Sequence, residues 1–163
     1  MVQPIHIRRA APADARALAE LLQEIVDAGG TTALTGQITR KDIVEWMRTS
    51  ARAAWHVAED NSGEILGFQW IEPMVEDPEH AAEIATFARK GKTGMGIGSR
   101  LFEATETAAR QLGYRWIRAN IRADNEGGLI YYQSRGFEDY GRIENYRMAD
   151  GTVVDKRLKR FDL

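Results

Sequence analysis

The segment RKGKTGMGIGS, residues 89 to 99, constrains the fold of this chain more strongly than any other. The run from Glu83 to Arg89 is typical of a β-strand, and an amphipathic helix begins at about Ser99. Glycine allows backbone torsions that other residues avoid, and the first amides of a helix carry a partial positive charge. A strand, a glycine-rich turn and a helix in this order predict a site that binds a diphosphate through backbone amides. The alternative is a tight turn that binds nothing.

Two other phosphate-binding loops fit this segment poorly. A P-loop reads G-x-x-x-x-G-K-S/T, and Gly91-Lys92-Thr93 supplies only its end. Its first glycine would fall at Thr86, a β-branched residue inside the expected strand. A dinucleotide-binding loop needs an acidic residue at the end of the next strand, and the strand expected over 116–122 has none. A P-loop nucleotide-binding protein is therefore only a remote alternative.

The rest of the chain alternates between strand and helix patterns. Period-two runs predict strands over 5–7, 54–59, 64–72, 83–89, 116–122, 137–148 and 153–161. Apolar spacings of three and four, with capping residues, predict helices over 12–28, 39–47, 99–112 and 125–135. This order predicts a single α/β (α+β) domain over residues 1–163. We expect a mixed, largely antiparallel central sheet of about seven strands, flanked by about four helices.

Composition excludes several kinds of function. The formal net charge of −2 gives no argument for a nucleic acid or membrane partner. The chain has no cysteine, and its three histidines (His6, His56 and His80) lack the spacing of metal ligands, so we expect no metal. No apolar run suits a signal peptide or a membrane span, so the expected location is cytoplasmic.

Two motifs, in order and at a suitable spacing, carry a resemblance to a known family. Residues 93–98, TGMGIG, are similar to the signature Q/R-x-x-G-x-G/A at the start of a long helix. Residues 125–137, NEGGLIYYQSRGF, are similar to N-x-x-A-x-x-x-Y-x-x-x-G-F. The chain thus resembles the GCN5-related N-acetyltransferases (the GNAT family), most firmly over residues 81–140. Within the family it is most similar to the phosphinothricin and amino-acid N-acyltransferase branch.

The chain departs from the family pattern at two positions. Thr93 stands where the family has Arg or Gln, so a cation near the diphosphate is missing, although Lys92, Lys90 or Arg89 could supply one. Gly128 replaces an alanine, which lowers helix propensity by under about 1 kcal/mol.

The resemblance implies acetyl-coenzyme A (acetyl-CoA) as co-substrate and no metal. Its diphosphate would lie on the amides of Gly94 to Ser99, and its pantetheine arm along the strand that ends at residues 87–89. The implied cofactor-binding residues are Phe87, Ala88, Arg89, Gly94, Met95, Gly96, Ile97, Gly98, Ser99, Asn125 and Tyr132. Asn125 has an equally good alternative role as a helix cap.

The resemblance also suggests two catalytic residues. Tyr132 matches the family tyrosine that protonates the departing thiolate, and its alternative role is packing against the cofactor. Glu83 is the one carboxylate within its expected strand and could accept the proton of the amine, directly or through water; the alternative is a carboxylate that binds no substrate. His80 is a rival base, and Tyr131 is expected in the core. A strand amide near residue 87 or 88 would hold the oxyanion.

The expected function is therefore N-acetyl transfer from acetyl-CoA to a primary amine of a small molecule, an amino acid or analogue, by direct attack in a ternary complex. We expect residues 29–37, 70–74 and 143–146 to line the acceptor groove, and Arg118, Arg122 or Arg9 to hold a substrate carboxylate. Members of the family often form homodimers, but this sequence gives no independent sign of one. The alternative function is a non-catalytic acyl-CoA-binding sensor or interaction domain.

Overall fold

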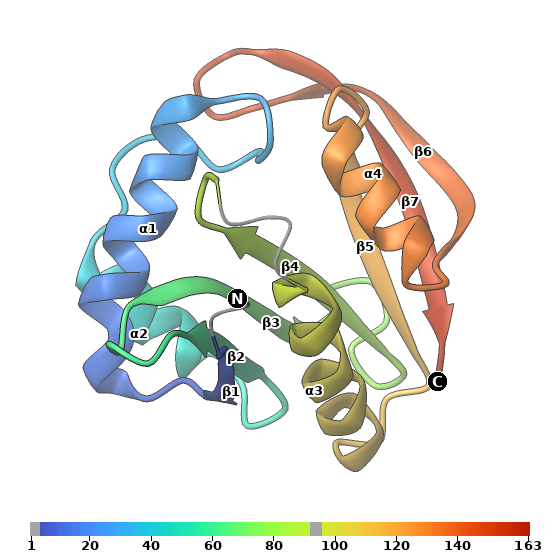
Figure 1. Cartoon of the computed structure of the whole chain (residues 1–163). Coiled ribbons are helices and arrows are strands. Elements are labelled where there is room, and N and C mark those ends of the chain that lie inside the picture. The colour runs from blue at the N-terminus through green and yellow to red at the C-terminus, as the bar shows by residue number, and fades with distance from the viewer. Residues whose placement is uncertain (1–3, 92–95) are drawn as a thin grey trace.

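The computed structural model describes residues 4–91 and 96–163. Within these ranges seven strands form one sheet in the order β1-β2-β3-β4-β5-β7-β6 (Figure 1). The strands are β1 (His6–Arg9), β2 (Ala54–Glu59), β3 (Ile65–Pro73), β4 (Ala81–Ala88), β5 (Trp116–Arg122), β6 (Glu138–Arg147) and β7 (Val153–Asp162). The helices are α1 (Ala15–Ala28), α2 (Arg40–Met47), α3 (Ile97–Gln111) and α4 (Glu126–Ser134), with a 3-10 turn, η1 (Pro12–Asp14), before α1. The expected fold class and element order are confirmed.

Local capping signals set the helix boundaries. The α2 helix begins with a reciprocal pair, in which the Asp42 amide donates to Thr39 Oγ1 at 3.2 Å and the Thr39 amide donates to Asp42 Oδ2 at 2.9 Å. The α1 helix ends at Gly29, whose φ of 70° suits glycine. Both boundaries follow the sequence prediction.

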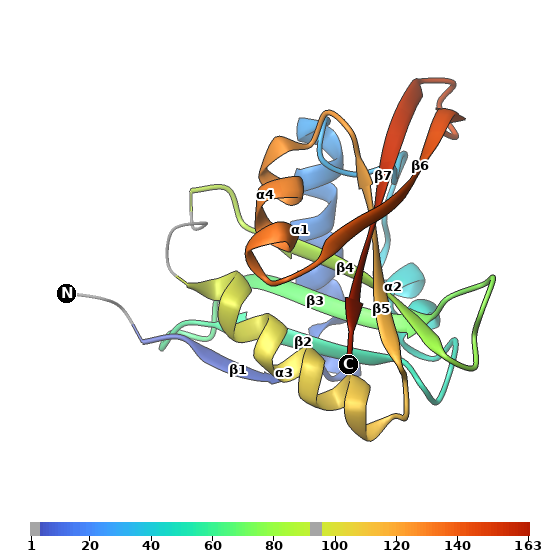
Figure 2. The ribbon, with the colours of Figure 1, turned by 90° about the vertical axis from the view of Figure 1, so that its right-hand side faces the viewer.

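The helices cover the two faces of the sheet in pairs (Figure 2). On the face of α1 and α2, the sheet contributes stacked aromatic rings; the Trp55 and Trp70 ring centroids are 4.1 Å apart, and Phe68 and Phe87 pack beside them. The opposite face, covered by α3 and α4, is filled by smaller side chains of β2 to β5 and by aromatic rings that include Phe102, Phe137 and Phe161. A side chain on β3 or β4 therefore meets one pair of helices or the other, according to its place in the strand alternation.

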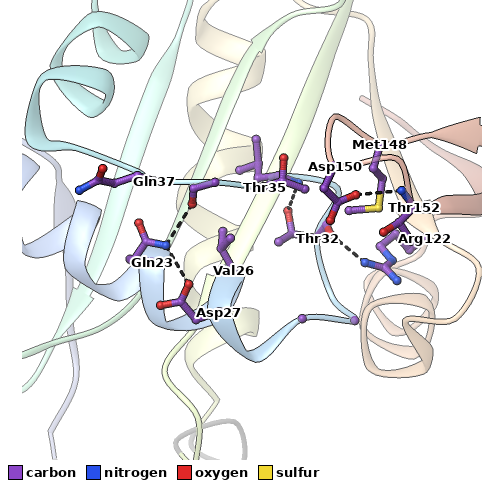
Figure 3. A pocket seen from close by; sticks show the side chains of 14 residues that line it. Gln23, Val26, Asp27, Thr32, Thr35, Gln37, Arg122, Met148, Asp150 and Thr152 are labelled. Carbon is purple, nitrogen blue, oxygen red and sulfur yellow. Dashed lines mark hydrogen bonds between the residues drawn. The ribbon is translucent and has the colours of Figure 1, made fainter.

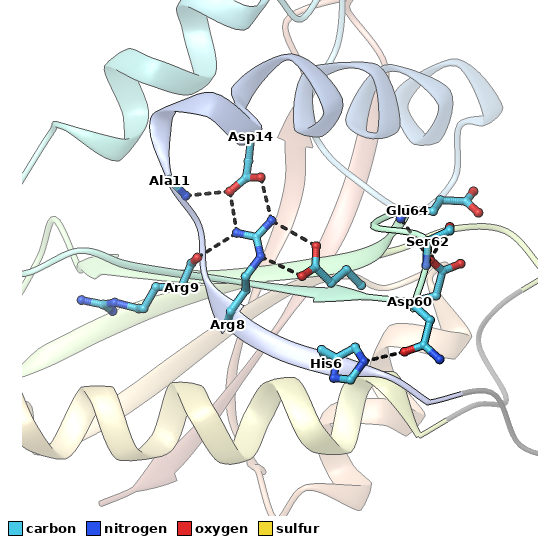
Figure 4. A network of polar contacts seen from close by, with 10 residues as sticks. His6, Arg8, Arg9, Ala11, Asp14, Asp60, Ser62 and Glu64 are labelled. Carbon is cyan, nitrogen blue, oxygen red and sulfur yellow. Dashed lines mark hydrogen bonds and ion pairs between the residues drawn. The ribbon is translucent and has the colours of Figure 1, made fainter.

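A partly buried ion cluster at the edge of the sheet connects the N-terminal strand to its neighbours (Figure 4). The guanidinium of Arg8 in β1 donates to both oxygens of Asp14 in η1, each at 2.8 Å. The same group donates to both oxygens of Glu59 in β2, at 3.0 and 3.2 Å. Arg8 thus joins the turn before α1 to the first two strands.

The central strands β4 and β5 are parallel and part halfway along their length (Figure 1). They are in register from Ala81 opposite Trp116 to Ile84 opposite Ala119. Beyond that point β4 pairs with β3 as far as Ala88, and β5 pairs with β7 as far as Arg122. Within the described part of the chain, residues 85–88 of β4 have a strand partner on one edge alone. The two strands therefore diverge in a V, and we call the stretch where they no longer pair the slot.

Candidate active site

The slot has an ionic cluster on the α1 and α2 face of the sheet. Glu83, one residue before the strands part, accepts a hydrogen bond from Arg118 Nη2 on β5 at 2.6 Å. The same nitrogen donates to Glu76 at 3.1 Å. Glu72 on β3 lies directly opposite Glu83 on β4. Burial, together with the charge of Glu83, raises the pKa of Glu72. A buried guanidinium thus holds the candidate base at the mouth of the slot.

The other face of the slot carries a network of hydroxyl groups. Tyr132 on α4 is buried, and its Oη lies 2.7 Å from Thr86 Oγ1 on β4. Its neighbour Tyr131 packs against the same core and donates to the Gly98 carbonyl of α3 at 2.7 Å. Gln69 Nε2 on β3 donates to Thr86 Oγ1 at 2.9 Å and to Tyr131 Oη at 3.0 Å. The network joins two strands to the start of α3 and to the C-terminal half of α4.

Both phenols are held in the neutral form. Burial raises the pKa of Tyr131 to about 12. Burial also raises the pKa of Tyr132 well above its usual value, and the hydrogen bond with Thr86 opposes part of that rise. Tyr132 therefore keeps its proton at neutral pH and can donate a hydrogen bond to an anion beside it.

Part of the expected diphosphate loop lies within the described residues. Gly96 is the N-cap of α3 with a φ of 73°, a left-handed conformation that favours glycine. The amides of Ile97, Gly98 and Ser99 belong to the first turn of α3, where the helix itself supplies no acceptor. Thr93, Gly94 and Met95 lie outside the described residues.

Close packing explains why glycine stands at position 98. A Cβ added there would lie 2.5 Å from Cε1 of the Tyr131 ring, well inside van der Waals contact. The ring of Tyr131 therefore rests directly on the backbone of the first turn of α3. This contact joins the two helices that carry the family motifs.

The residues at the end of β4 have different surroundings. The Phe87 side chain is buried among the aromatic rings on the α1 face, whereas Ala88 pairs with Gly67. Arg89 donates to the Ile65 carbonyl from two nitrogens, at 3.2 and 3.1 Å, and pairs with Glu24 and Glu64. The Arg89 charge is thus neutralised within the chain, which leaves exposed Lys90 as the described candidate for the missing cation.

Asn125 has a structural role at the start of α4. Its Oδ1 accepts from the Gly128 amide at 3.0 Å, so it is the N-cap of the helix. Its Nδ2 donates to the Thr31 carbonyl at 3.2 Å. A Cβ at Gly128 would lie 2.5 Å from Asn125 Nδ2, so the capping side chain occupies the space that an alanine methyl would need.

A pocket of about 550 Å³ lies beside the end of β5 (Figure 3). One wall is the loop after α1, as expected for residues 29–37, and the other includes Arg122, Met148, Asp150 and Thr152. Residues 143–146, also predicted for the acceptor groove, do not line this pocket, whereas Met148, Asp150 and Thr152 around the β6–β7 turn do. Residues 70–74 do not line this pocket, and Trp70 and Met74 at the ends of that range are buried in the core.

Two of the three arginines expected to bind a substrate carboxylate are bound to carboxylates of the chain itself. Arg118 pairs with Glu83 and Glu76. Arg122 pairs with Asp124 at 2.8 Å and donates to the Thr32 carbonyl at 3.1 Å. Exposed Arg9 lies on β1, at the far edge of the sheet from the slot.

The rival base His80 lies at the wrong end of β4. It precedes the strand and its Nδ1 lies 3.0 Å from Asp77 Oδ1. Four residues of strand separate it from the place where β4 and β5 part, a distance of about 13 Å. Of the two candidate bases, Glu83 therefore lies closer to the place where the strands part.

Gln69 and Thr86 contact the candidate tyrosines, and the sequence pattern did not predict either contact. Gln69 is a polar residue within the apolar run ILGFQWI, and it is fully buried. A buried amide needs hydrogen-bond partners, and this need is the one sign of a polar contact that the sequence offers at position 69. Its partners lie on other elements and could not be named from the pattern.

The mixed sheet with a diverging central parallel pair, and the helix that begins at a glycine turn beside it, belong to a fold that this chain shares with solved acetyltransferase structures. The model of the Acetyltransferase (GNAT) family matches residues 18–137. The chain belongs to this family of acetyltransferases. No helix among the described residues is long and apolar enough to cross a membrane.

Known proteins similar to this chain agree with that assignment. The "Putative phosphinothricin acetyltransferase YwnH" of Bacillus subtilis (strain 168) is 27% identical over 161 residues, covering 96% of this chain and 94% of that protein. The "5-NmdU N-acetyltransferase" of Pseudomonas phage PaMx11 is 31% identical over 127 residues, covering 75% and 84%. The crystal structure of a phosphinothricin acetyltransferase from Sinorhizobium meliloti in complex with AcCoA shares the fold, with a TM-score of 0.87, 20% identity and coverage of 98% and 88%.

Proposed function

We propose that this protein transfers the acetyl group of acetyl-CoA to the primary amine of a small molecule, with an amino acid or an amino-acid analogue as the acceptor. The observation that carries the proposal is the slot between β4 and β5, with a carboxylate on one face and a buried phenol on the other. Membership of the acetyltransferase family and the names of the phosphinothricin acetyltransferases similar to this chain support it.

The chain offers backbone groups suited to acetyl-CoA. The edge of β4 at residues 85–88 that faces the slot can pair with the amides of the pantetheine arm. The first-turn amides of α3 can hold the diphosphate, as helix N-termini hold anions. Acetyl-CoA supplies an activated acyl group and a thiolate leaving group. The proposed contacts include Phe87, Ala88, Arg89 and Gly94 to Ser99.

Glu83 acts as the proton acceptor for the attacking amine. An ammonium has no lone pair, so it must lose a proton before it can attack the thioester carbon. Arg118 fixes the position of the Glu83 carboxylate through their 2.6 Å contact. A β4 amide near residue 87 or 88 donates to the carbonyl oxygen as it gains negative charge. The new C–N bond forms as the C–S bond breaks, and the sulfur leaves with the electron pair.

Tyr132 donates its hydroxyl proton to that sulfur. It comes from the α4 side, opposite Glu83, so the proton acceptor and the proton donor do not compete for one position. The acceptor reaches the slot from the pocket beside Arg122, where the carboxylates of Asp27 and Asp150 attract a cationic ammonium group (Figure 3).

Two measurements test this function. The melting temperature with acetyl-CoA or with ATP tests cofactor binding, and stabilisation by acetyl-CoA alone is expected. Release of free thiol is then followed with phosphinothricin, amino acids, polyamines and aminoglycosides as acceptors. Stabilisation by acetyl-CoA without thiol release from any acceptor would favour the alternative, a non-catalytic acyl-CoA sensor. Stabilisation by ATP would contradict the proposal.

A further inference from the structure

Gln69 and Thr86 connect the tyrosines of α4 to the centre of the sheet. They are register partners on β3 and β4, and both point to the face covered by α3 and α4. Gln69 is fully buried, and its amide nitrogen donates to Thr86 and to Tyr131. Thr86 in turn lies 2.7 Å from Tyr132 Oη. Hydrogen bonds thus run without a break from Gln69 to the candidate acid.

The Gly98 carbonyl determines the direction of these bonds. A carbonyl oxygen can only accept, so the hydroxyl of Tyr131 donates to it. The oxygen of Tyr131 then accepts from Gln69, which requires the nitrogen of the amide on this side. The second hydrogen of that nitrogen goes to Thr86. The hydrogen of the Thr86 hydroxyl is therefore free to be donated to Tyr132.

This arrangement leaves the Gln69 amide oxygen without a partner. Gln69 Oε1 is buried and has no hydrogen-bond partner among residues 4–91 and 96–163. An unpaired buried oxygen is destabilising, and an apolar side chain of similar size would avoid it. The two hydrogen bonds that Gln69 donates, and not a gain in stability, therefore explain why an amide side chain stands at this position.

We infer that Gln69 and Thr86 are positioning residues that hold a hydrogen-bond donor on the Tyr132 oxygen while Tyr132 protonates the departing thiolate. This inference rests on the proposed function. As the S–H bond forms and the O–H bond breaks, the electron pair stays on the Tyr132 oxygen. Thr86 donates to that phenolate, and Gln69 strengthens the donation by donating to Thr86. The phenolate regains a proton from solvent water after coenzyme A leaves.

The surroundings of Tyr132 explain why such help is needed. Burial disfavours a phenolate and raises the pKa of Tyr132, whereas the hydrogen bond with Thr86 acts in the opposite direction. Without this donor, the buried phenol would be a poorer acid and would donate more weakly to a thiolate. Thr86→Val removes the donor and keeps the shape of the side chain, and Thr86→Ser keeps the donor.

The test uses the ionisation of coenzyme A bound to the full chain. Thiolate absorbance is followed against pH for the wild type, Tyr132→Phe, Thr86→Val, Thr86→Ser and Gln69→Met, with folding checked by circular dichroism. We expect Thr86→Val to reduce the ionisation constant of the bound thiol about five- to tenfold, toward the value for Tyr132→Phe, with Thr86→Ser close to wild type. Gln69→Met should act in the same direction, and it provides the test if Thr86→Val does not fold.

Kinetics provides a second measurement. Thr86→Val should lower kcat about five- to tenfold without changing KM for acetyl-CoA, and adding it to Tyr132→Phe should cause no further loss. Normal thiol ionisation and kcat in Thr86→Val and Gln69→Met, with a defect in Tyr132→Phe, would overturn this inference alone. Normal values in Tyr132→Phe would overturn both the role of Tyr132 and the inference. Failure of the wild type to bind coenzyme A would overturn the proposed function itself.

Discussion

The Glu83 carboxylate and the Arg118 guanidinium meet at 2.6 Å across the last parallel pairs of β4 and β5. Arg118 is 8% exposed, whereas the Glu83 side chain is 28% exposed, so the guanidinium is buried and the carboxylate stays accessible. It places a negative charge and its counterion at the point where the sheet opens. A carboxylate in this position can take a proton from a substrate without a change in the sheet.

Glu83→Gln should therefore lower kcat about a hundredfold, since a general base contributes typically that much or more. KM for acetyl-CoA should change little, because the diphosphate and pantetheine contacts lie elsewhere. Glu76→Gln is the matched control: Glu76 also accepts from Arg118 Nη2, but its side chain is 62% exposed. Steady-state thiol release measures both variants. Equal effects of the two substitutions would show that the role of Glu83 is to neutralise Arg118.

Gly98→Ala should destabilise the protein by about 1–3 kcal/mol, because the new methyl group would overlap the Tyr131 ring. Gly127→Ala in α4 is the control, since a Cβ there meets nothing closer than 3.9 Å. That control should stabilise the helix by up to about 1 kcal/mol. Urea unfolding measures both free energies. Similar stability of the two variants would contradict the close contact of Tyr131 with α3.

The free energy of unfolding should decrease at acidic pH because His56 is buried in its neutral form. Its side chain is 7% exposed, and burial, with Arg9 opposite it on β1, lowers the pKa of His56 to about 4. Above pH 6.5 the imidazole is neutral in both the folded and the unfolded chain. Below pH 6.5 the unfolded chain binds the proton first, so the free energy of unfolding decreases by about 3 kcal/mol down to pH 4. His56→Gln should remove this part of the pH dependence, and His6→Gln, at an exposed site, should keep it.

Asp14→Asn should cost about 1–2 kcal/mol of stability at neutral pH, because it weakens the paired hydrogen bonds with Arg8. Arg8 lowers the pKa of Asp14, so this stabilisation is present above the ordinary value of 3.8 and is lost as pH falls below it. Glu20→Gln breaks the exposed pair with Arg16 and should cost less than about 0.5 kcal/mol. Guanidinium unfolding at pH 7 and pH 3 measures the free energy of unfolding of both variants. An equal loss of stability at the two pH values in Asp14→Asn would contradict this prediction.

Local signals allowed much of the fold to be predicted from the sequence. The capping pair of Thr39 and Asp42 and the glycine after α1 act within a few residues, so the ends of these helices could be predicted from them. The alternation over 116–122 likewise predicted β5 at its observed bounds.

The contacts of the site depend on residues far apart in the chain. Arg118 was expected to be available for a substrate, but its partner Glu83 is 35 residues away on a neighbouring strand. Gln69 and Tyr131 are 62 residues apart. Strand register and helix packing bring such pairs together, and neither leaves a periodic pattern in the sequence.

The two walls of the pocket come from segments that are made at different times during synthesis. The loop after α1 is held by Arg122, through the Thr32 carbonyl, and by Asn125, through the Thr31 carbonyl, while the opposite wall is the β6–β7 turn. During synthesis from the N-terminus this loop emerges early, and the residues that hold it emerge roughly 90 positions later. A nascent chain that ends before β6 has the segments of the first five strands but lacks one wall of this pocket. An acceptor bound there, as we propose, could be selected only after residues 148–152 have been made.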